Sequence, residues 1–372
     1  MLISLALDFR RTGIGSRERF HLSREELTRL YAEPAESSVS ELMLLSTCNR
    51  IELYAWSHVS HESEVAAIQG ALAERWTGSN SSAAELLALA THRTGADAVR
   101  HLLRVAAGLE SQVLGDSQVL HQVRKAYAGA TGYGAVGPRL HRLLQMALRA
   151  GRRVRRETGL GRDHLTMGAA AARFAAARAG GLTGRGCVVV GAGKTAGQVL
   201  RQLVGLGATR LVVVNRTPEA AWKVAQAVGA SSLPLAALHQ AVADTDVAIL
   251  ATGADRPLLT SQALEAARAV AGRADTSLLV VDLGMPRNAE PSLARLRGVS
   301  IVDLDALHPA LDSRNPSAGD VTAAERIVED AATQFAVWLR DYTARRAPAE
   351  SFPEVLDPAV HAAAPEAFAG RT

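Results

Sequence analysis

The 372-residue sequence is poor in cysteine, in aromatic residues and in net charge. Its two cysteines, Cys48 and Cys187, stand far apart, which excludes a disulfide scaffold and a cysteine-based zinc site. This usage fits a reducing environment, so we expect a cytoplasmic protein without a metal. Aromatic residues make up only 4%, and their pattern indicates no RNA-binding module. A formal net charge of +4 does not by itself indicate a nucleic-acid-binding protein.

Long apolar runs and a targeting leader are also missing. Arginines interrupt the alanine-rich runs before any reaches about 18 residues, so we expect no transmembrane helix. The first residues, MLISLALDFRRTG, show no basic leader before an apolar core and no small-residue cleavage site, which argues against a signal peptide. Hydrophobic residues at 48% and charged residues at 21% are typical of a soluble globular protein, and the length indicates two or three domains.

The first part of the chain predicts an α+β domain. LISLAL is a short apolar run, and SREELTRLYA has the Ser-x-x-Glu pattern of a helix start. SELMLLSTCNRIELYAW is β-rich on both sides of a polar break. Apolar positions every three or four residues predict helices over about 65–155, interrupted by GYGAVGP.

The second part predicts a parallel sheet. An alanine-rich helix ends at Gly180-Gly181, and a strand, glycine turn, helix, strand and helix follow. DVAILATG, SLLVVDLGMP and VSIVDLDAL predict further strands. One more helix covers about 321–345, and the Pro- and Ala-rich tail from Ala347 predicts disorder.

The segment VVVGAGKTAG predicts a dinucleotide-binding turn. Gly191 allows the tight turn after the strand, and Gly193 lets backbone N–H groups approach a pyrophosphate at the helix N-terminus. The third position of the motif is Ala196, which its G/A version permits. A lone GxGxxA is a weak motif, but here the strand, turn, helix and second strand occur in the expected order.

The end of the second strand predicts the kind of cofactor. NAD-specific sites carry an acidic residue about 20 residues on, whereas this sequence has Asn215-Arg216-Thr217. A guanidinium suits a 2′-phosphate, which favours NADPH, although a solvated loop arginine is the alternative. The predicted cofactor-binding residues are Gly191, Ala192, Gly193, Lys194, Thr195, Ala196, Asn215, Arg216 and Thr217.

Cys48 is the candidate nucleophile. Unpaired cysteines are commonly buried and behave as small hydrophobes, and we interpret Cys187, which opens the apolar strand CVVV, in that way. Cys48 instead lies in the polar cluster Ser-Thr-Cys-Asn-Arg, where a nearby cation lowers a thiol's pKa. A reactive cysteine in a chain with an NADPH site suggests that a thiolate accepts an acyl group and that hydride reduces the thioester to an aldehyde.

Several blocks resemble the glutamyl-tRNA reductase family. STCNRIELY resembles its cysteine signature, and HLLRVAAGLESQVLGDSQVLHQVRKAYAGA resembles its long helical signature. RRVRRETGL, GAGKTAG with NRT, and VDLGMPRNAEPSL match later blocks in the same order, so the resemblance covers about residues 1–345. It implies NADPH-dependent reduction of glutamyl-tRNA to glutamate-1-semialdehyde through a Cys48 thioester, feeding tetrapyrrole precursor synthesis.

The resemblance also implies residue roles. Cys48 matches the nucleophile, and His101 matches a histidine needed for activity, as a base or a positioning group; without the match it would be a core-edge histidine. Arg50 suits bidentate pairing with a glutamyl carboxylate. Gln118 and Gln122 share one helix face, which a polar helix surface would explain equally well. The implied substrate-binding residues are Thr47, Asn49, Arg50, Ser111, Asp116, Ser117, Gln118 and Gln122.

The sequence departs from the family pattern in three places. Residues 8–12, DFRRT, replace an Asn-His-Lys-Thr run, and Asp116-Ser117 replaces a Glu-Pro pair. The alternative role for Asp116 and Ser117 is to cap the next helix. Both changes concern the amino-acid pocket, so a paralogue for another aminoacyl-tRNA and a non-catalytic tRNA-binding or regulatory relative are the alternatives. Only the beginning of the family's spine helix is present, so we expect a weakened homodimer.

Seven arginines crowd one helical stretch in which Glu157 is the only nearby acid: Arg139, Arg142, Arg149, Arg152, Arg153, Arg155 and Arg156. They predict contacts with tRNA phosphates or, equally, a solvated helix face or domain junction. The expected partners are a charged tRNA, glutamyl-tRNA foremost, and the downstream semialdehyde aminotransferase, with no membrane.

The prediction is thus an α/β multidomain protein. It comprises an N-terminal α+β catalytic domain (1–155), a Rossmann-type NADPH-binding domain (160–308), a C-terminal spine helix (320–346) and a disordered tail (347–372).

Overall fold

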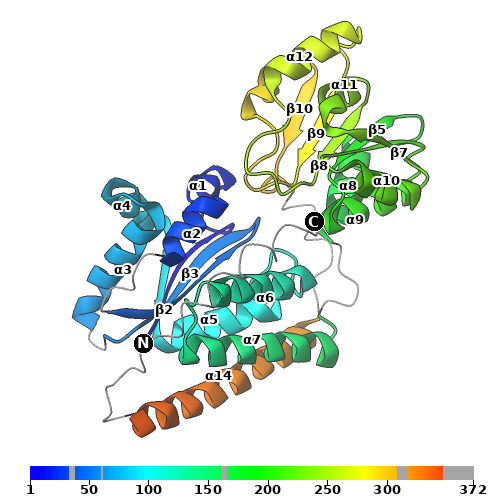
Figure 1. The fold of residues 1–372 in the computed structure, drawn as a ribbon. Helices are drawn as coiled ribbons and strands as arrows, with labels where there is room; N and C mark the ends of the chain where they lie inside the picture. The colour runs from blue at the N-terminus through cyan, green and yellow to red at the C-terminus, as the bar shows by residue number, and fades with distance from the viewer. Residues whose placement is uncertain (33–37, 60–61, 161–165, 308–316, 347–372) are drawn as a thin grey trace. The chain divides into compact units, whose positions relative to one another are not determined.

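The computed structural model describes residues 1–32, 38–59, 62–160, 166–307 and 317–346 (Figure 1). These residues form two compact units. The first unit comprises the described residues of 1–12, 20–164 and 316–372, and the second those of 13–19 and 165–315. The tail from residue 347, for which the sequence predicts disorder, lies outside the described residues.

The first unit contains a four-stranded antiparallel sheet in the order β2-β3-β1-β4. Its strands are β1 (Leu2–Asp8), β2 (Val39–Ser46), β3 (Arg50–Ser57) and β4 (Thr91–Thr94). The first three confirm the apolar runs of the sequence. The short polar segment THRT was not predicted as a strand, because its only support is edge pairing with β1.

The described residues of the first unit form seven helices besides this sheet. They are α2 (Arg24–Ala32), α3 (Glu62–Thr77), α4 (Asn80–Leu89), α5 (Gly95–Ala107), α6 (Ser117–Gly132), α7 (Pro138–Glu157) and α14 (Ala318–Arg346). The predicted start of α2 is confirmed, because Ser23 and Glu26 exchange side chain-to-backbone hydrogen bonds of 2.8 and 3.2 Å. Helix α14 confirms the predicted spine helix and packs against α5 and α7.

The second unit is a six-stranded parallel sheet in the order β10-β9-β8-β5-β6-β7. Its strands are β5 (Gly186–Val190), β6 (Arg210–Asn215), β7 (Ser231–Pro234), β8 (Val247–Leu250), β9 (Leu278–Asp282) and β10 (Val299–Val302). This order is that of the doubly wound dinucleotide-binding fold, as the sequence predicts. The mostly exposed edge strand β7 was not predicted, because SSLP lacks an apolar run.

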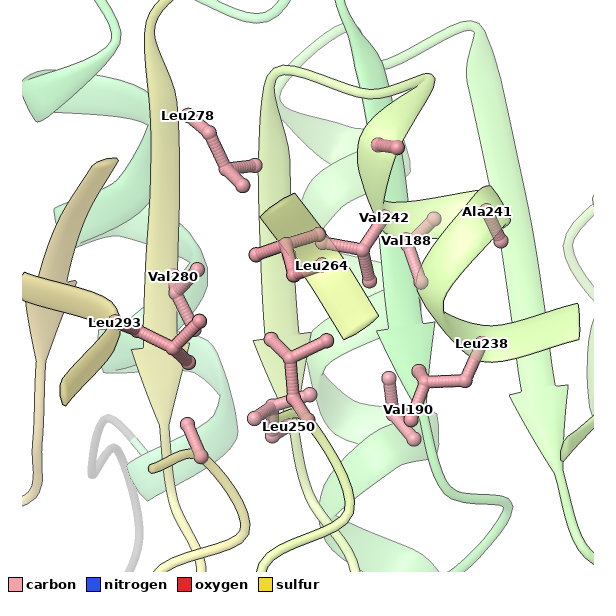
Figure 2. Packing of buried hydrophobic residues seen from close by; sticks show 14 of the residues in the cluster. Val188, Val190, Leu238, Ala241, Val242, Leu250, Leu264, Leu278, Val280 and Leu293 are labelled. Carbon is pink, nitrogen blue, oxygen red and sulfur yellow. The ribbon is translucent and has the colours of Figure 1, made fainter. Parts of the chain in front are cut away.

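Helices on both sides of the parallel sheet complete this unit. They are α8 (Met167–Arg178), α9 (Lys194–Gly205), α10 (Pro218–Gln226), α11 (Leu238–Ala243) and α12 (Ser261–Val270), with short 3-10 helices at Leu235–Ala237 and Pro291–Arg295. Figure 2 shows the apolar core under one face, where Val188 and Leu250 meet Val242 and Leu264. The central strands of this parallel sheet are continuous apolar runs in the sequence, because both faces of the sheet are buried.

Helix α1 (Ile14–Arg19) belongs to the second unit, although the sequence places it within the first predicted domain. Buried Arg17 donates to Asp305 at 2.6 Å, and Arg287 pairs with Glu18 at 2.6 Å. These ion pairs could not be predicted, because they join residues almost 300 positions apart. Within the ranges described, no helix is long and apolar enough to cross a membrane.

Candidate active site

Cys48 lies at the tip of the hairpin that joins β2 and β3. The Thr47 amide donates to the Arg50 carbonyl at 2.8 Å, which leaves Cys48 and Asn49 as a two-residue turn. The Thr47 hydroxyl oxygen accepts from the amides of Asn49 and Arg50 at 3.2 and 3.1 Å. Buried Thr47 therefore fixes the turn, and Cys48 is half-buried at its tip. Cys187, in contrast, is fully buried in β5, as its structural interpretation expects.

Three polar side chains follow the turn on one face of β3. Arg50, Glu52 and Tyr54 alternate with apolar residues, and all three are at most 2% exposed. Arg50 Nη1 donates to Glu52 Oε1 at 2.7 Å, and the Tyr54 hydroxyl donates to Glu52 Oε2. The second Nη of Arg50 donates to the Glu110 carbonyl. Both Nη atoms thus bond within the protein, which is how a buried charge is satisfied and which differs from the expected bidentate contact with a substrate.

His101 completes this buried network. It lies on α5 and is 4% exposed, with Nε2 3.0 Å from Glu52 Oε1. Although burial opposes ionisation of Glu52, the facing His101 and Arg50 hold the pKa of this carboxyl well below its usual range. An ionised carboxylate can only accept hydrogen bonds, so Nε2 of His101 carries a proton. Glu52 therefore sets the orientation and tautomer of the histidine, as a carboxylate partner does in acid–base sites.

The segments around the hairpin contain the residues that depart from the family pattern. The Phe9 amide donates to the Asn49 carbonyl at 2.9 Å, which places residues 8–12 directly beside the Cys48 turn. Arg10 pairs with Glu110, and Arg104 donates to Glu110 Oε1 at 2.6 Å. The loop that leads to α6 is thereby held against the hairpin through Glu110.

The remaining predicted substrate residues lie in the first turns of α6 and in the loop before it. Asp116 is the N-cap residue, and its Oδ1 accepts from the Gln118 amide at 2.9 Å, which confirms the capping alternative for this residue. Ser111, Gln118 and Gln122 are half-buried. Ser117 begins the helix, and its side chain lies outside the described part. Substrate contacts by these residues stay predictions.

Sequence reasoning missed Glu52, Tyr54 and Glu110 as parts of the site. A charged pair at i and i+2 in a strand of otherwise apolar residues, as in RIELY, was the available signal for Glu52. Such a pair must either face solvent or be satisfied inside, and β3 is buried throughout. Glu110 gave no signal, because its partners Arg10 and Arg104 are identified only by the fold.

The glycine turn of the second unit has the geometry expected of a dinucleotide site. Gly191 has φ +115°, and a Cβ there would lie 2.4 Å from the Ala251 carbonyl oxygen. A Cβ on Gly193, the N-cap of α9, would meet no atom within 4 Å, so the space over this helix N-terminus is open. Ala196 is fully buried where α9 packs on the sheet, and Lys194 is exposed. These residues fit a pyrophosphate.

Both halves of the predicted cofactor site lie together at the carboxyl edge of the sheet. The Gly191 amide donates to the Val214 carbonyl at 2.8 Å, so the turn adjoins residues 215–217. Asn215 Nδ2 donates to the Thr217 carbonyl at 3.1 Å, and Arg216 and Thr217 are exposed. At the same edge, buried Asp282 accepts from the amides of Gly284 and Ala289, and burial raises its pKa to about 6.

Two glycine substitutions separate folding from cofactor binding. We expect Gly191→Ala to destabilise the protein by about 1–3 kcal/mol, because its φ is strained for alanine and its Cβ collides with backbone. Gly193→Ala should leave the melting temperature unchanged but weaken NAD(P)H binding about tenfold or more, because its methyl group enters the phosphate space. Thermal unfolding with and without cofactor measures both effects. A Gly193→Ala protein that binds NAD(P)H normally would contradict this placement.

A doubly wound parallel sheet with a glycine turn, together with a unit that holds a half-buried cysteine at a hairpin turn and a buried Glu–His pair, defines an NAD(P)-binding oxidoreductase. Residues 5–158 match the family model of the glutamyl-tRNAGlu reductase N-terminal domain, and residues 173–310 match that of shikimate/quinate 5-dehydrogenase. The chain belongs to the glutamyl-tRNA reductase family, as its similarity to individual members also shows.

Curated relatives match the chain over most of its length. The glutamyl-tRNA reductase of Salinibacter ruber is 37% identical over 343 residues, which cover 90% of this chain and 68% of the relative. That of Salinispora arenicola is 36% identical over 347 residues, covering 91% and 74%. The solved structure of glutamyl-tRNA reductase from Methanopyrus kandleri is 26% identical, with a TM-score of 0.49 and coverage of 93% and 82%. The matches to the two curated relatives confirm the resemblance predicted from the motifs.

Proposed function

We propose that the chain reduces glutamyl-tRNA to glutamate-1-semialdehyde with NADPH, through a thioester on Cys48. The observation that carries this proposal is the half-buried cysteine at a fixed turn, joined through Thr47 and Arg50 to the buried Glu52–His101 pair. Relatives 36–37% identical over about nine-tenths of the chain bear the name of this activity.

In the first step, the Cys48 thiolate attacks the carbonyl carbon of the aminoacyl ester. A C–S bond forms, the C–O bond to the terminal ribose breaks, and the ribose oxygen takes up a proton. His101, held through Nε2 by Glu52, keeps Nδ1 for proton exchange with the groups around the thiol. When bound, the reduced nicotinamide supplies the hydride that converts the thioester to an aldehyde and returns the thiolate. The hydrogen-bonded hairpin turn positions the backbone of Cys48 in both steps.

Arg216 selects the phosphorylated cofactor in this proposal. It is exposed directly after β6, beside the glycine turn, where a guanidinium can pair with a 2′-phosphate. Arg216→Ala should raise the KM for NADPH about tenfold or more and leave the KM for NADH unchanged. The matched control is Arg210→Ala, an exposed arginine at the other end of β6. Equal effects on both cofactors would contradict this role.

A second candidate is a paralogue that reduces another aminoacyl-tRNA. The hydrogen bond between Phe9 and Asn49 places the divergent residues 8–12 beside the cysteine, which favours an altered amino-acid pocket. Single-turnover reduction with a panel of charged tRNAs separates the candidates, because glutamyl-tRNA alone supports turnover in the first proposal.

A regulatory relative would leave NADPH intact with every tRNA; the retained Cys48 and His101 argue against it. Homodimerisation and contact with the aminotransferase stay predictions.

A further inference from the structure

Helices α6 and α7 have an unusual charge. They carry two basic residues on α6 and seven arginines on α7, against a single acid, Glu157. The whole chain is nearly balanced, with 41 basic and 37 acidic residues. The two helices pack side by side (Figure 1). Two adjacent helices of the first unit thus carry nine basic residues and one acid.

Some of these arginines have structural roles. Arg139 lies 3.7 Å from buried Glu41 and 5.7 Å from the Trp56 ring centre, and Arg142 lies 5.7 Å from the Trp338 ring centre. These two hold α7 against the sheet and α14, all within the first unit. At the other end of α7, Arg153 and Arg156 both pair with Glu157.

Three of the other exposed arginines form a stripe across the two helices. A Cβ on Gly151 would lie 2.7 Å from Leu120, and Gln145 Nε2 donates to the Tyr127 hydroxyl at 3.3 Å. These two contacts set an antiparallel register in which Arg124 of α6 lies alongside Arg149 of α7. We define the basic stripe as Arg124, Arg149 and Arg152, which are all exposed. Among the described residues, no acidic side chain forms an ion pair with them.

The neighbouring helices show that unpaired arginine is not general in this unit. On α5, Arg100 pairs with Glu329 of α14 at 3.2 Å, and Arg104 pairs with Glu110 at 2.6 Å and with Glu325 of α14. Helix α14 thus supplies acids to α5, whereas the basic stripe receives none from the described residues. Such a surface remains available to an external polyanion.

We infer that the basic stripe binds the phosphodiester backbone of the tRNA; this inference rests on the proposed function. Asp116, the N-cap of helix α6, comes shortly after Glu110, whose carbonyl oxygen contacts Arg50 beside the Cys48 turn. The stripe and the acceptor site thus belong to one unit, joined by α6. A membrane-binding helix would add large apolar side chains to the basic ones, but α6 and α7 expose no large hydrophobic side chain within their described residues.

The test is a triple variant, Arg124→Ala, Arg149→Ala and Arg152→Ala, of the full chain. Its matched control replaces three exposed arginines of the second unit, Arg178, Arg201 and Arg210, by alanine. We expect the stripe variant to bind glutamyl-tRNA about tenfold more weakly at moderate salt. The slope of log affinity against log salt should fall in magnitude by roughly 2–3, one contact for each arginine. The control should match the wild type in both quantities.

The substitution Glu157→Gln tests the inference in the opposite direction, because it should strengthen tRNA binding. It removes the only acid of the two helices and releases Arg153 and Arg156 from their pairing, so tRNA binding should tighten by roughly two- to threefold and its salt slope should steepen. Because Glu157 is exposed, circular dichroism and the melting temperature should not change. A variant with unchanged affinity and slope would count against the stripe.

Two further measurements separate the inference from the proposed function. Acylation of Cys48 by a glutamyl thioester of a small thiol, which has no phosphodiester backbone, should proceed equally in the wild type and the stripe variant. A wild type that reduces glutamyl-tRNA while the stripe variant keeps its KM and salt slope overturns the inference alone. A wild type that binds tRNA through the stripe but reduces none overturns the proposed function alone. Loss of binding to anionic phospholipid vesicles, with tRNA affinity unchanged, would make the stripe a membrane site and overturn the inference.

Discussion

Replacing Cys48 by serine is expected to reduce aldehyde formation from glutamyl-tRNA by about a thousandfold or more. A serine hydroxyl has no comparable fraction of anion at neutral pH, whereas a thiolate is both populated and strongly nucleophilic. The measurement is single-turnover oxidation of NADPH with charged tRNA. Cys187→Ala is the matched control, because this fully buried residue in β5 has no part in the reaction. It should keep the wild-type rate and lose only some stability.

Alkylation can show which cysteine is reactive. Burial, with a contribution from Asp246, raises the pKa of Cys187 to about 11, so this thiol stays protonated at pH 8. Iodoacetamide should therefore label Cys48 first in the folded protein, with loss of activity in step with labelling. Full activity after complete modification of Cys48 would contradict its role as the nucleophile.

Replacing Glu52 by alanine is expected to lower the free energy of unfolding by about 3–5 kcal/mol and to abolish reduction. The change leaves the buried guanidinium of Arg50 without its carboxylate partner, which is among the costliest defects in a protein interior. It also releases Nε2 of His101. Urea unfolding measures the stability. Tyr54→Phe is the control, because it removes one hydrogen bond to the same carboxylate and should cost only about 0.5–1.5 kcal/mol.

The lowered pKa of Glu52 predicts how the free energy of unfolding depends on pH. The pKa of Glu52 is lowered in the folded state, whereas an unfolded glutamate titrates near 4.3. The unfolded state therefore binds the proton first, so the stabilisation is complete above about pH 5 and is lost as the pH falls below about 4. Glu52→Gln should be less stable than the wild type at pH 7, and the difference should shrink on acidification. Parallel stability curves for the two proteins would show that Glu52 is not ionised in the fold.

The elements that could be predicted from sequence are those with a strong local pattern. Strands β5, β8 and β9 are continuous apolar runs, and the Ser23–Glu26 exchange marks the start of α2. Strands β4 and β7 could not be predicted, because each depends on edge pairing rather than on its own residues. The place of α1 in the second unit depends on the distant partners Asp305 and Arg287.

Some residues of the candidate site could likewise be predicted from local sequence, whereas the roles of others depend on the fold. Cys48 could be predicted because polar residues interrupt two apolar runs there, and the cofactor turn could be predicted from its glycines. The role of Arg50 depends on what it contacts: the sequence suggests a charge open to a ligand, whereas the fold buries it between Glu52 and Glu110. Likewise, the seven arginines of α7 look equivalent in sequence. Contacts with Trp56, Trp338 and Glu157 separate the structural ones from Arg149, Arg152 and Arg155.

The thioester itself is the most direct test of this account. The protein is mixed with glutamyl-tRNA in the absence of NADPH, quenched in acid, digested, and analysed by mass spectrometry. The account predicts a glutamyl group on the peptide that contains Cys48, absent after hydroxylamine treatment and converted to free aldehyde when NADPH is added before the quench. Aldehyde production by a protein that never carries glutamate on this cysteine would contradict it.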